Sequence, residues 1–193
     1  MRNKNISLIV KTMTREHFTA LDVVRIVGGL LFFNALLSYW FTSSTTWGYH
    51  GKYIDWRFWH HKILEPELHL SLNELSSYTG ENNGRLLLAI NGSVYDVSSN
   101  RAVYGPKGSY HSLVGKDAAR VFVTGCFMKP DEYTYDLRGL DEKECQKDIK
   151  GWQQFFQTHR DYWYVGKVEL TFDFINKDPP SPCEHVKFPG HIG

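Results

Sequence analysis

The chain has 193 residues, of which 42% are hydrophobic and 22% are charged, a composition that suits one modest domain with accessory segments. The formal net charge of +1 argues against a general nucleic-acid binder, because phosphate recognition needs a concentrated basic face. Aromatic residues make up 15%, which indicates either a pocket for a flat ligand or a belt of rings at a membrane surface.

The first element is an apolar run over residues 23–41, which approaches the ~17–25 residues that a helix needs to cross a bilayer. Arg25 would reach back to the headgroups, and the amide of Asn34 would need a partner in lipid. We predict a transmembrane anchor at residues 22–42, behind a cytosolic segment 1–21. Two alternatives stay open: a cleaved signal peptide, whose polar start would be unusually long, and a buried core helix, which would need a second surface to pack against.

The charges on either side of this run predict its orientation, since cytoplasmic flanks carry an excess of Lys and Arg. The cations before it or at its start are Arg2, Lys4, Lys11, Arg15 and Arg25, and the first ones after it are Lys52 and Arg57. This bias places the N-terminus in the cytosol and the domain in the lumen. The span is short, which suits the thinner bilayer of the endoplasmic reticulum.

An aromatic connector follows at residues 43–66, and we expect it to lie on the membrane surface or against the domain. The pair His60-His61 could suggest a metal site. Adjacent side chains point apart on a helix or strand, however, so solvated histidines are the favoured interpretation.

The remainder reads as a small α+β domain at residues 67–173, ahead of a disordered or loosely docked tail at 174–193. The first expected elements are a helix through Tyr78, opened by a capping box at Ser71 and Glu74, and two strands at 85–90 and 93–97 around Asn91-Gly92. A helix at 118–124, capped by Asp117, should follow. The last elements are a helix opened by a capping box at Asp141 and Glu144 and a strand at 162–170. Asn-Gly is the strongest short hairpin signal, and Ser/Asp three residues before Glu is typical of a helix start. Along the last helix, the expected buried face comprises Ile149, Trp152, Phe155 and Phe156.

The three cysteines, Cys126, Cys145 and Cys183, lack zinc-site spacing. One disulfide with one thiol left over, or three isolated thiols, are both compatible with the pattern. We find no catalytic constellation and expect no enzyme that acts alone. The acid pairs Asp131-Glu132 and Asp141-Glu142 fit solvated turns and a helix start.

Five motifs together resemble the membrane-associated progesterone receptor family, a branch of the cytochrome b5-like haem/steroid-binding fold, and its neuferricin-like members most. The motifs are AINGSVYDVSS (89–99), YGPKGSY (104–110), VGKDAARVFVTG (114–125), DLRGL (136–140) and the ending from Trp152 to Val165-Gly166-Lys167. They occur in the family's order over roughly residues 68–170. The resemblance implies a cytochrome b5-like domain, with a short sheet, a hairpin and helices, behind an N-terminal anchor.

The resemblance also implies a non-covalent, b-type haem site. Family members use the second tyrosine of Tyr-Gly-Pro-x-Gly-x-Tyr as the axial metal ligand, which maps to Tyr110. The matching cofactor-binding positions are Tyr104, Gly105, Pro106 and Tyr162. A tyrosinate oxygen is a hard anionic ligand that favours ferric iron. The glycines would let backbone approach a flat macrocycle.

Other interpretations of these residues remain. The tyrosines could be half-buried packing residues, and His111 could be the ligand in place of Tyr110. Asp161 replaces a lysine that is frequent before the last tyrosine in the family, and its carboxylate could repel haem propionates. Lys107, Lys116 and Arg120 are near enough in sequence to meet those propionates.

By resemblance, the chain is a haem-binding regulator or adaptor, or a haem donor, for a membrane-bound partner such as a cytochrome P450-type or sterol-modifying oxidase. A homodimer through exposed haem faces is part of this hypothesis. Two alternatives are an electron carrier, which the absence of a histidine pair disfavours, and a non-haem, sterol-related interaction module on the same fold.

Overall fold

The structure is a computed structural model that describes residues 19–171, 178–181 and 183. The N-terminal cations that set the predicted orientation, other than Arg25, lie outside these residues, as does most of the predicted tail. The chain divides into two compact units, Met1–His50 and Gly51–Gly193. The second half of the predicted connector therefore belongs to the same unit as the domain.

The described part of the first unit is built on one helix, Ala20–Thr42 (α2). Thr19 opens it with a reciprocal capping box, in which its hydroxyl accepts from the Asp22 amide and the Asp22 carboxylate accepts from the Thr19 amide. Asn34 has the partner it needs, since the Trp47 indole donates to its side-chain oxygen (3.3 Å). Among the described residues α2 is the one helix long and apolar enough to cross a membrane, with a mean hydropathy of 1.8. Its bounds agree with the predicted anchor.

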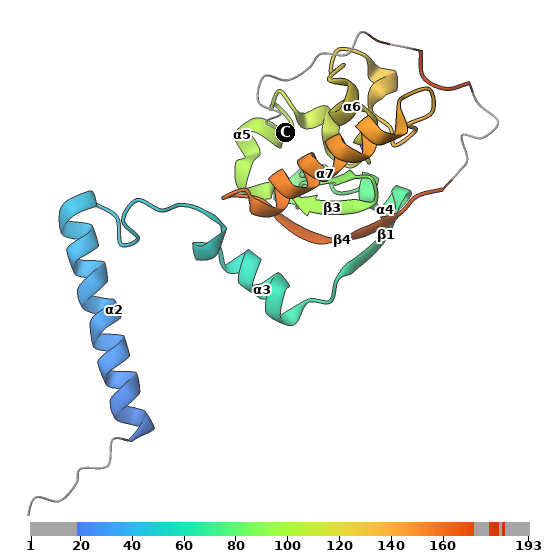
Figure 1. Ribbon diagram of the computed structural model, residues 1–193. Coiled ribbons are helices and arrows are strands. Elements are labelled where there is room, and N and C mark those ends of the chain that lie inside the picture. The colour runs from blue at the N-terminus through green and yellow to red at the C-terminus, as the bar shows by residue number, and fades with distance from the viewer. Residues whose placement is uncertain (1–18, 172–177, 182, 184–193) are drawn as a thin grey trace, which may run out of the picture. The chain divides into compact units, whose positions relative to one another are not determined.

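The second unit is an α+β domain, as predicted, with one four-stranded sheet. Its strands and α-helices are Trp56–Leu64 (α3), Leu68–Ser71 (β1), Leu72–Ser76 (α4), Leu87–Ile90 (β2), Ser93–Asp96 (β3), Arg101–Tyr104 (α5), Ala119–Thr124 (α6), Glu142–Thr158 (α7) and Trp163–Glu169 (β4). The strand order is β1-β4-β3-β2, with β1 parallel to β4 and the other pairs antiparallel (Figure 1).

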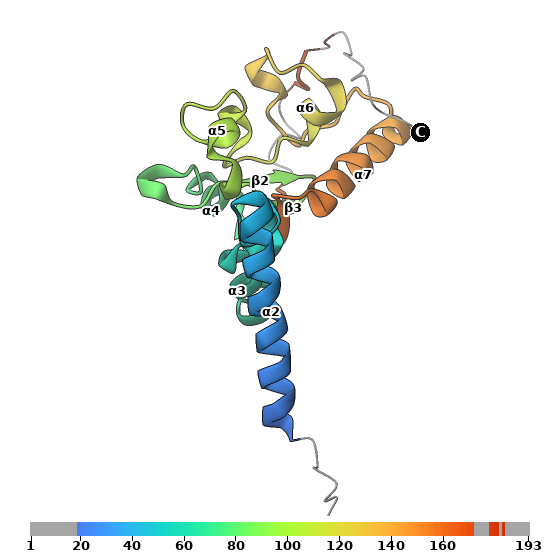
Figure 2. The ribbon, with the colours of Figure 1, turned by 90° about the vertical axis from the view of Figure 1, so that its left-hand side faces the viewer.

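The sheet is covered on both faces, which explains why every residue of β2 is buried. Leu88 and Ile90 point into a core shared with α5, α6 and α7, whereas Leu87 and Ala89 point into a second core with α3 and α4. This division follows from the period of two along a strand. In Figures 1 and 2 α6 lies above the sheet and α3 lies below it.

The predicted hairpin forms at Asn91 and Gly92, which have φ of 48° and 84°. Positive φ at both central residues is the requirement of a type I′ turn, which Asn-Gly meets at little cost. Asp117 holds this turn, because its carboxylate accepts from the amides of Asn91 (3.0 Å) and Gly92 (2.6 Å) as well as from Ala119 (3.1 Å). The residue predicted as a helix cap thus ties the hairpin to the start of α6.

The predicted cap of α6 was wrong, because Ala118 and not Asp117 occupies its N-cap position and no side chain caps it. Of the two predicted capping boxes, the first is confirmed in full and the second in part. Ser71 and Glu74 make both bonds of their box, and at α7 the Asp141 carboxylate accepts from the Glu144 amide. Phe155, predicted on the buried face of α7, is 44% exposed, with ring contacts to Trp152, Phe156 and His159. The prediction was wrong there because Phe156 is the residue directed into the core, and Phe155, about 100° around the helix from it, lies at the margin of the buried face.

The segment around α3 lies against the domain. Phe58 is buried with its ring centroid 5.7 Å from that of Trp163. The Nζ of Lys52 donates to the carbonyls of Gln157 (2.8 Å) and Tyr162 (3.1 Å). Burial lowers the pKa of Lys52, and the neighbouring charge of Lys62 acts in the same direction. Carbonyl oxygens at the end of α7 are suitable partners for this ammonium, because a helix C-terminus carries partial negative charge.

The two adjacent histidines do not point apart. His60 and His61 each place Nδ1 3.0 Å from a different oxygen of Glu65, just beyond the end of α3. Hydrogen bonding to His61 is the main cause of the lowered pKa of Glu65. The prediction failed because the chain turns after Leu64 and brings one carboxylate within reach of both rings.

Candidate functional site

Three tyrosines from separate parts of the chain meet at one end of the domain. Tyr104 is the last residue of α5, Tyr110 follows the next turn, and Tyr162 immediately precedes β4. The ring centroids of Tyr104 and Tyr110 are 6.3 Å apart, and those of Tyr104 and Tyr162 are 5.6 Å apart. The structure therefore brings together the three tyrosines predicted to form the site.

The three rings differ sharply in exposure. Tyr104 and Tyr162 are only 6% and 5% exposed, whereas Tyr110 is 41% exposed. Burial raises the pKa of Tyr104 far above its usual range, and interactions with Tyr162 and Tyr110 add to the effect. Tyr104 is consequently a neutral phenol that can donate a hydrogen bond. Tyr110 is by far the most exposed phenol of the three.

The loop between α5 and Tyr110 is closed by its own backbone. Gly108 donates to the Gly105 carbonyl (2.7 Å), and the Tyr110 amide donates to the Val103 carbonyl (3.0 Å). A Cβ on Gly105 would lie 2.4 Å from the Arg101 carbonyl oxygen, and one on Gly108 would lie 2.1 Å from that of Val103. These glycines therefore let the loop pack against α5, which holds Tyr110 beside Tyr104. Pro106 is exposed on the same loop.

Residues around the tyrosines fix their orientation. The His111 Nδ1 lies 2.9 Å from the Tyr104 carbonyl oxygen, so that ring nitrogen is engaged with backbone. Asn100 donates to the Tyr162 hydroxyl (3.1 Å). His159 stacks on the other side of Tyr162, with centroids 4.0 Å apart and planes within 11°. Burial lowers the pKa of His159, which favours the neutral imidazole in this stack.

Asp161, the departure from the family pattern, does not stand alone beside Tyr162. The Arg160 guanidinium binds its carboxylate, with Nε 3.1 Å from Oδ1 and Nη2 3.3 Å from Oδ2. This pairing offsets the negative charge that would oppose an anionic ligand group. Lys107 is exposed on the loop itself, and Lys116 is exposed with its Nζ 5.5 Å from the centre of the Tyr133 ring.

Arg120 cannot meet propionates, so that expectation was wrong. Its side chain is buried, and its guanidinium is bonded on all sides. The Nε contacts Glu132 (3.2 Å), and Nη1 donates to the carbonyls of Asp136 (2.8 Å) and Arg138 (2.9 Å). An arginine that is fully engaged inside the domain organises the segment after α6 and does not face a ligand.

Glu132 is likewise not the solvated acid that the sequence predicted. It is fully buried, and its second oxygen accepts from the Thr124 hydroxyl (2.7 Å). Sequence reasoning missed this pair because one member sits in an acidic turn, Asp131-Glu132, that looks exposed. An arginine in the middle of an apolar helix, as in Arg120-Val121-Phe122, is the signal that could have revealed it.

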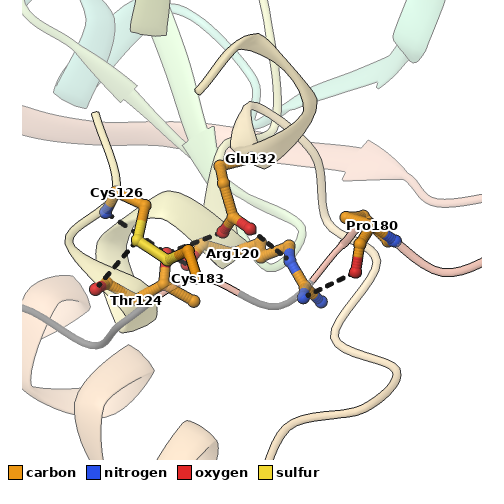
Figure 3. The surroundings of a disulfide bond; sticks show 6 residues. All are labelled: Arg120, Thr124, Cys126, Glu132, Pro180 and Cys183. Atoms are coloured by element: carbon orange, nitrogen blue, oxygen red, sulfur yellow. Dashed lines mark hydrogen bonds and ion pairs between the residues drawn. A yellow bond between two sulfur atoms is a disulfide. The ribbon is translucent and has the colours of Figure 1, made fainter. Parts of the chain in front are cut away.

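A disulfide between Cys126 and Cys183 closes the same region (Figure 3). The first of the two cysteine alternatives is therefore the one adopted, with Cys145 a buried free thiol. Figure 3 also shows the Pro180 carbonyl, which accepts from Arg120 (3.4 Å). Next to the bridge, Phe127 lies edge-on to Tyr110, with centroids 5.6 Å apart. The disulfide thus tethers the loop that supports the exposed tyrosine.

Two hollows lie on other faces of the domain. One, of about 430 Å³, is lined by Leu137, Leu140 and one side of α7. The other, of about 460 Å³, lies between α3 and β4 and is lined by Phe58 and Trp163. None of the three tyrosines lines either of them. These two hollows are therefore separate from the tyrosine cluster, in which Tyr110 is the exposed member.

Comparison with known proteins gives similarity over the same part of the chain. Residues 71–169 match the model of the cytochrome b5-like heme/steroid binding domain. Neuferricin from Danio rerio is 38% identical over 123 residues, 63% of this chain and 45% of that protein. Membrane-associated progesterone receptor component 2 from Homo sapiens is 39% identical over 101 residues, 51% of this chain and 44% of that protein. The chain thus spans less than half of the length of these relatives.

A solved structure from Arabidopsis thaliana, described as having a cytochrome b5 like fold, is 30% identical with a TM-score of 0.47. The match covers 54% of this chain and 93% of that one. The family model alone covers more than half of the 193 residues and includes the hairpin, Tyr104, Tyr110 and Tyr162. The chain belongs to the cytochrome b5-like heme/steroid binding domain family.

Proposed function

We propose that this chain is a membrane-anchored haem-binding protein in which Tyr110 is the axial ligand of ferric haem. The observation that carries the proposal is the asymmetry of the tyrosine cluster, with Tyr110 41% exposed beside the buried phenols Tyr104 and Tyr162. One phenol is open to a ligand, and the other two can support it from within the domain.

The donor set of this cluster fits haem. A phenol ordinarily titrates near pH 10, but a bound cation deprotonates its ligand far below that value. Tyrosinate is an established proximal haem ligand, and its hard oxygen stabilises the ferric state. Tyr104 stays protonated because burial raises its pKa, so it would donate a hydrogen bond at the site. Lys107, Lys116 and the Asp161-bound Arg160 would supply positive charge for the propionates.

Three features support membrane attachment with the domain on the lumenal side. Helix α2 has the length and hydropathy of a span, and the predicted excess of cations lies before it. The Cys126–Cys183 disulfide is typical of an oxidising compartment. Because disulfides form in the lumen of the endoplasmic reticulum, that membrane is the proposed location.

The proposed role is regulation of, or haem delivery to, a membrane-bound oxidase of cytochrome P450 or sterol-modifying type. A homodimer through exposed haem faces is compatible with the exposure of Tyr110. Electron transfer is less well supported. His111 is held on the Tyr104 carbonyl, and the described ring contacts of Tyr110 are with Tyr104 and Phe127, neither of which is a histidine.

A haem titration of the full chain in detergent tests the proposal. Wild type should bind one haem per chain, and Tyr110→Phe should weaken binding by at least about 100-fold, since the only ligand to the iron is lost. Tyr78→Phe is the matched control, because Tyr78 is a half-buried tyrosine that packs in the core on the other face of the sheet. It should bind haem as wild type does.

Other outcomes contradict the proposal in different ways. Equal haem affinity in wild type and Tyr110→Phe, with loss in His111→Ala, would make His111 the ligand. Failure of folded wild type to take up haem stoichiometrically would leave the non-haem interaction module as the function of this fold.

A further inference from the structure

An apolar face of α3 is left uncovered by the domain. Trp56, Trp59 and Ile63 recur at spacings of three and four residues, so they form one stripe along the helix. They are 70%, 44% and 69% exposed. Phe58 lies on the opposite side of the helix and is the residue that packs into the core. The stripe therefore points away from the domain.

Neighbouring residues extend this surface. The α3 apolar face comprises Ile54, Trp56, Trp59, Ile63 and Leu64, all at least 44% exposed. Five large apolar side chains exposed within eleven consecutive positions form a patch of the kind that marks an interaction site. The indole of Trp59 is already satisfied by the Tyr53 carbonyl (2.8 Å), so its ring can enter an apolar medium without losing a hydrogen bond.

We infer that the α3 apolar face lies in the lipid–water interface of the membrane that α2 spans. Trp and Tyr concentrate at this depth because their rings are apolar and their polar tips reach water. A helix that binds there presents one apolar face parallel to the membrane plane. The inference rests on the proposed membrane anchor and adds a second contact between chain and lipid.

The length of the connection favours lipid over any other occupant. Residues 43–55 join the end of α2 to the start of α3. Thirteen residues reach at most about 47 Å when fully extended, roughly the thickness of one bilayer with its headgroups. If α2 crosses a membrane, that membrane is consequently the apolar surface always within reach of Trp56 and Ile63.

Hydrogen bonds and a ring contact connect the α3 segment to the tyrosine cluster. Lys52, at the base of α3, donates through Nζ to the Tyr162 carbonyl (3.1 Å) and through its amide to the Arg160 carbonyl (2.8 Å). Phe58 adds the ring contact with Trp163. These bonds connect the helix to the residues at the start of β4. Docking of α3 would therefore set the orientation of the tyrosine site relative to the membrane.

The test uses the full chain in lipid nanodiscs with one environment-sensitive fluorophore on an introduced cysteine, in a Cys145→Ala background without reductant. Ile63→Cys reports on the apolar face, Lys143→Cys on an exposed position of α7, and Leu31→Cys on the middle of α2. We expect the probe at residue 63 to show blue-shifted emission, loss of quenching by iodide, and quenching by lipids spin-labelled near the headgroup. The probe at residue 143 should remain open to iodide and unaffected by these lipids.

The probe at residue 31 distinguishes failure of the inference about α3 from failure of the proposed membrane anchor. If it is protected from iodide while the probe at 63 stays exposed, the anchor stands and the interfacial position of α3 is overturned. Blue-shifted emission at 63 without quenching by spin-labelled lipid would mean a protein occupant and would also overturn it. If the probe at 31 is itself open to iodide, α2 is not in the bilayer and the membrane attachment falls first.

Discussion

Replacing Glu132 with alanine should lower the free energy of unfolding by about 3–5 kcal/mol, because it leaves the guanidinium of Arg120 buried without its charge partner. Glu132 and Arg120 are both buried, with 3.2 Å between Oε1 and Nε. The change also removes the acceptor of the Thr124 hydroxyl (2.7 Å). Denaturant unfolding of the full chain in detergent, followed by tryptophan fluorescence, measures the difference.

The neighbouring acid provides the control. Asp131 lies in the same short turn and is exposed, so Asp131→Ala should change stability by less than about 0.5 kcal/mol. In a second test, Arg120→Met combined with Glu132→Leu should recover part of the loss, since no unpaired charge remains, although the Asp136 and Arg138 carbonyls lose their donor. A Glu132→Ala protein as stable as Asp131→Ala would contradict the assigned role of the pair.

Loss of the Cys126–Cys183 disulfide should be the second large effect. The bridge joins residues 57 positions apart, and closing a loop of that size in the unfolded chain is worth up to about 4 kcal/mol. We expect dithiothreitol to lower the melting temperature of the full chain by roughly 10 °C. The dithiol reduces the bridge to two thiols and is itself oxidised to a cyclic disulfide.

A double variant, Cys126→Ser with Cys183→Ser, separates reduction of the bridge from other effects of the reductant. It should melt at the temperature of reduced wild type and should not respond to dithiothreitol. The same loss should weaken haem binding modestly, because the bridge is adjacent to Phe127, which packs on Tyr110. An equal response of both proteins to the reductant would show that the bridge does not stabilise the domain.

Much of the fold was predictable because it depends on interactions between residues close in sequence. The Asn91-Gly92 turn needs only two residues that tolerate positive φ, and the Ser71–Glu74 box needs only a three-residue spacing. Helix α2 likewise follows from one continuous apolar run, and its bounds, Ala20–Thr42, differ little from those of the predicted segment 22–42.

What could not be predicted depends on contacts between distant residues. Glu132 looked like a solvated acid until α6 placed Arg120 against it. Lys52 is buried at the end of α7, more than a hundred positions away along the chain, although lysine is rarely an interior residue. The pairing of Cys126 with Cys183 was one of two open alternatives, since spacing alone does not specify a bridge.

The candidate site could be predicted from the sequence only in part. The resemblance pointed to Tyr104, Tyr110 and Tyr162, and the structure places their rings together. Gly105 and Gly108 have a further role that the motif did not indicate, since they permit close packing of the loop on its own helix. Exposure separates the tyrosines in a way that the motif does not, because it depends on how α5 and β4 pack.

The most direct test of the account is the absorption and resonance Raman spectrum of the full chain loaded with ferric haem, recorded beside Tyr110→Phe and His111→Ala. We predict a high-spin ferric spectrum with a phenolate-to-iron charge-transfer band and phenolate ring modes, retained in His111→Ala and lost in Tyr110→Phe. An unchanged spectrum in Tyr110→Phe, or a low-spin spectrum with histidine ligation in wild type, would contradict tyrosinate ligation at this site.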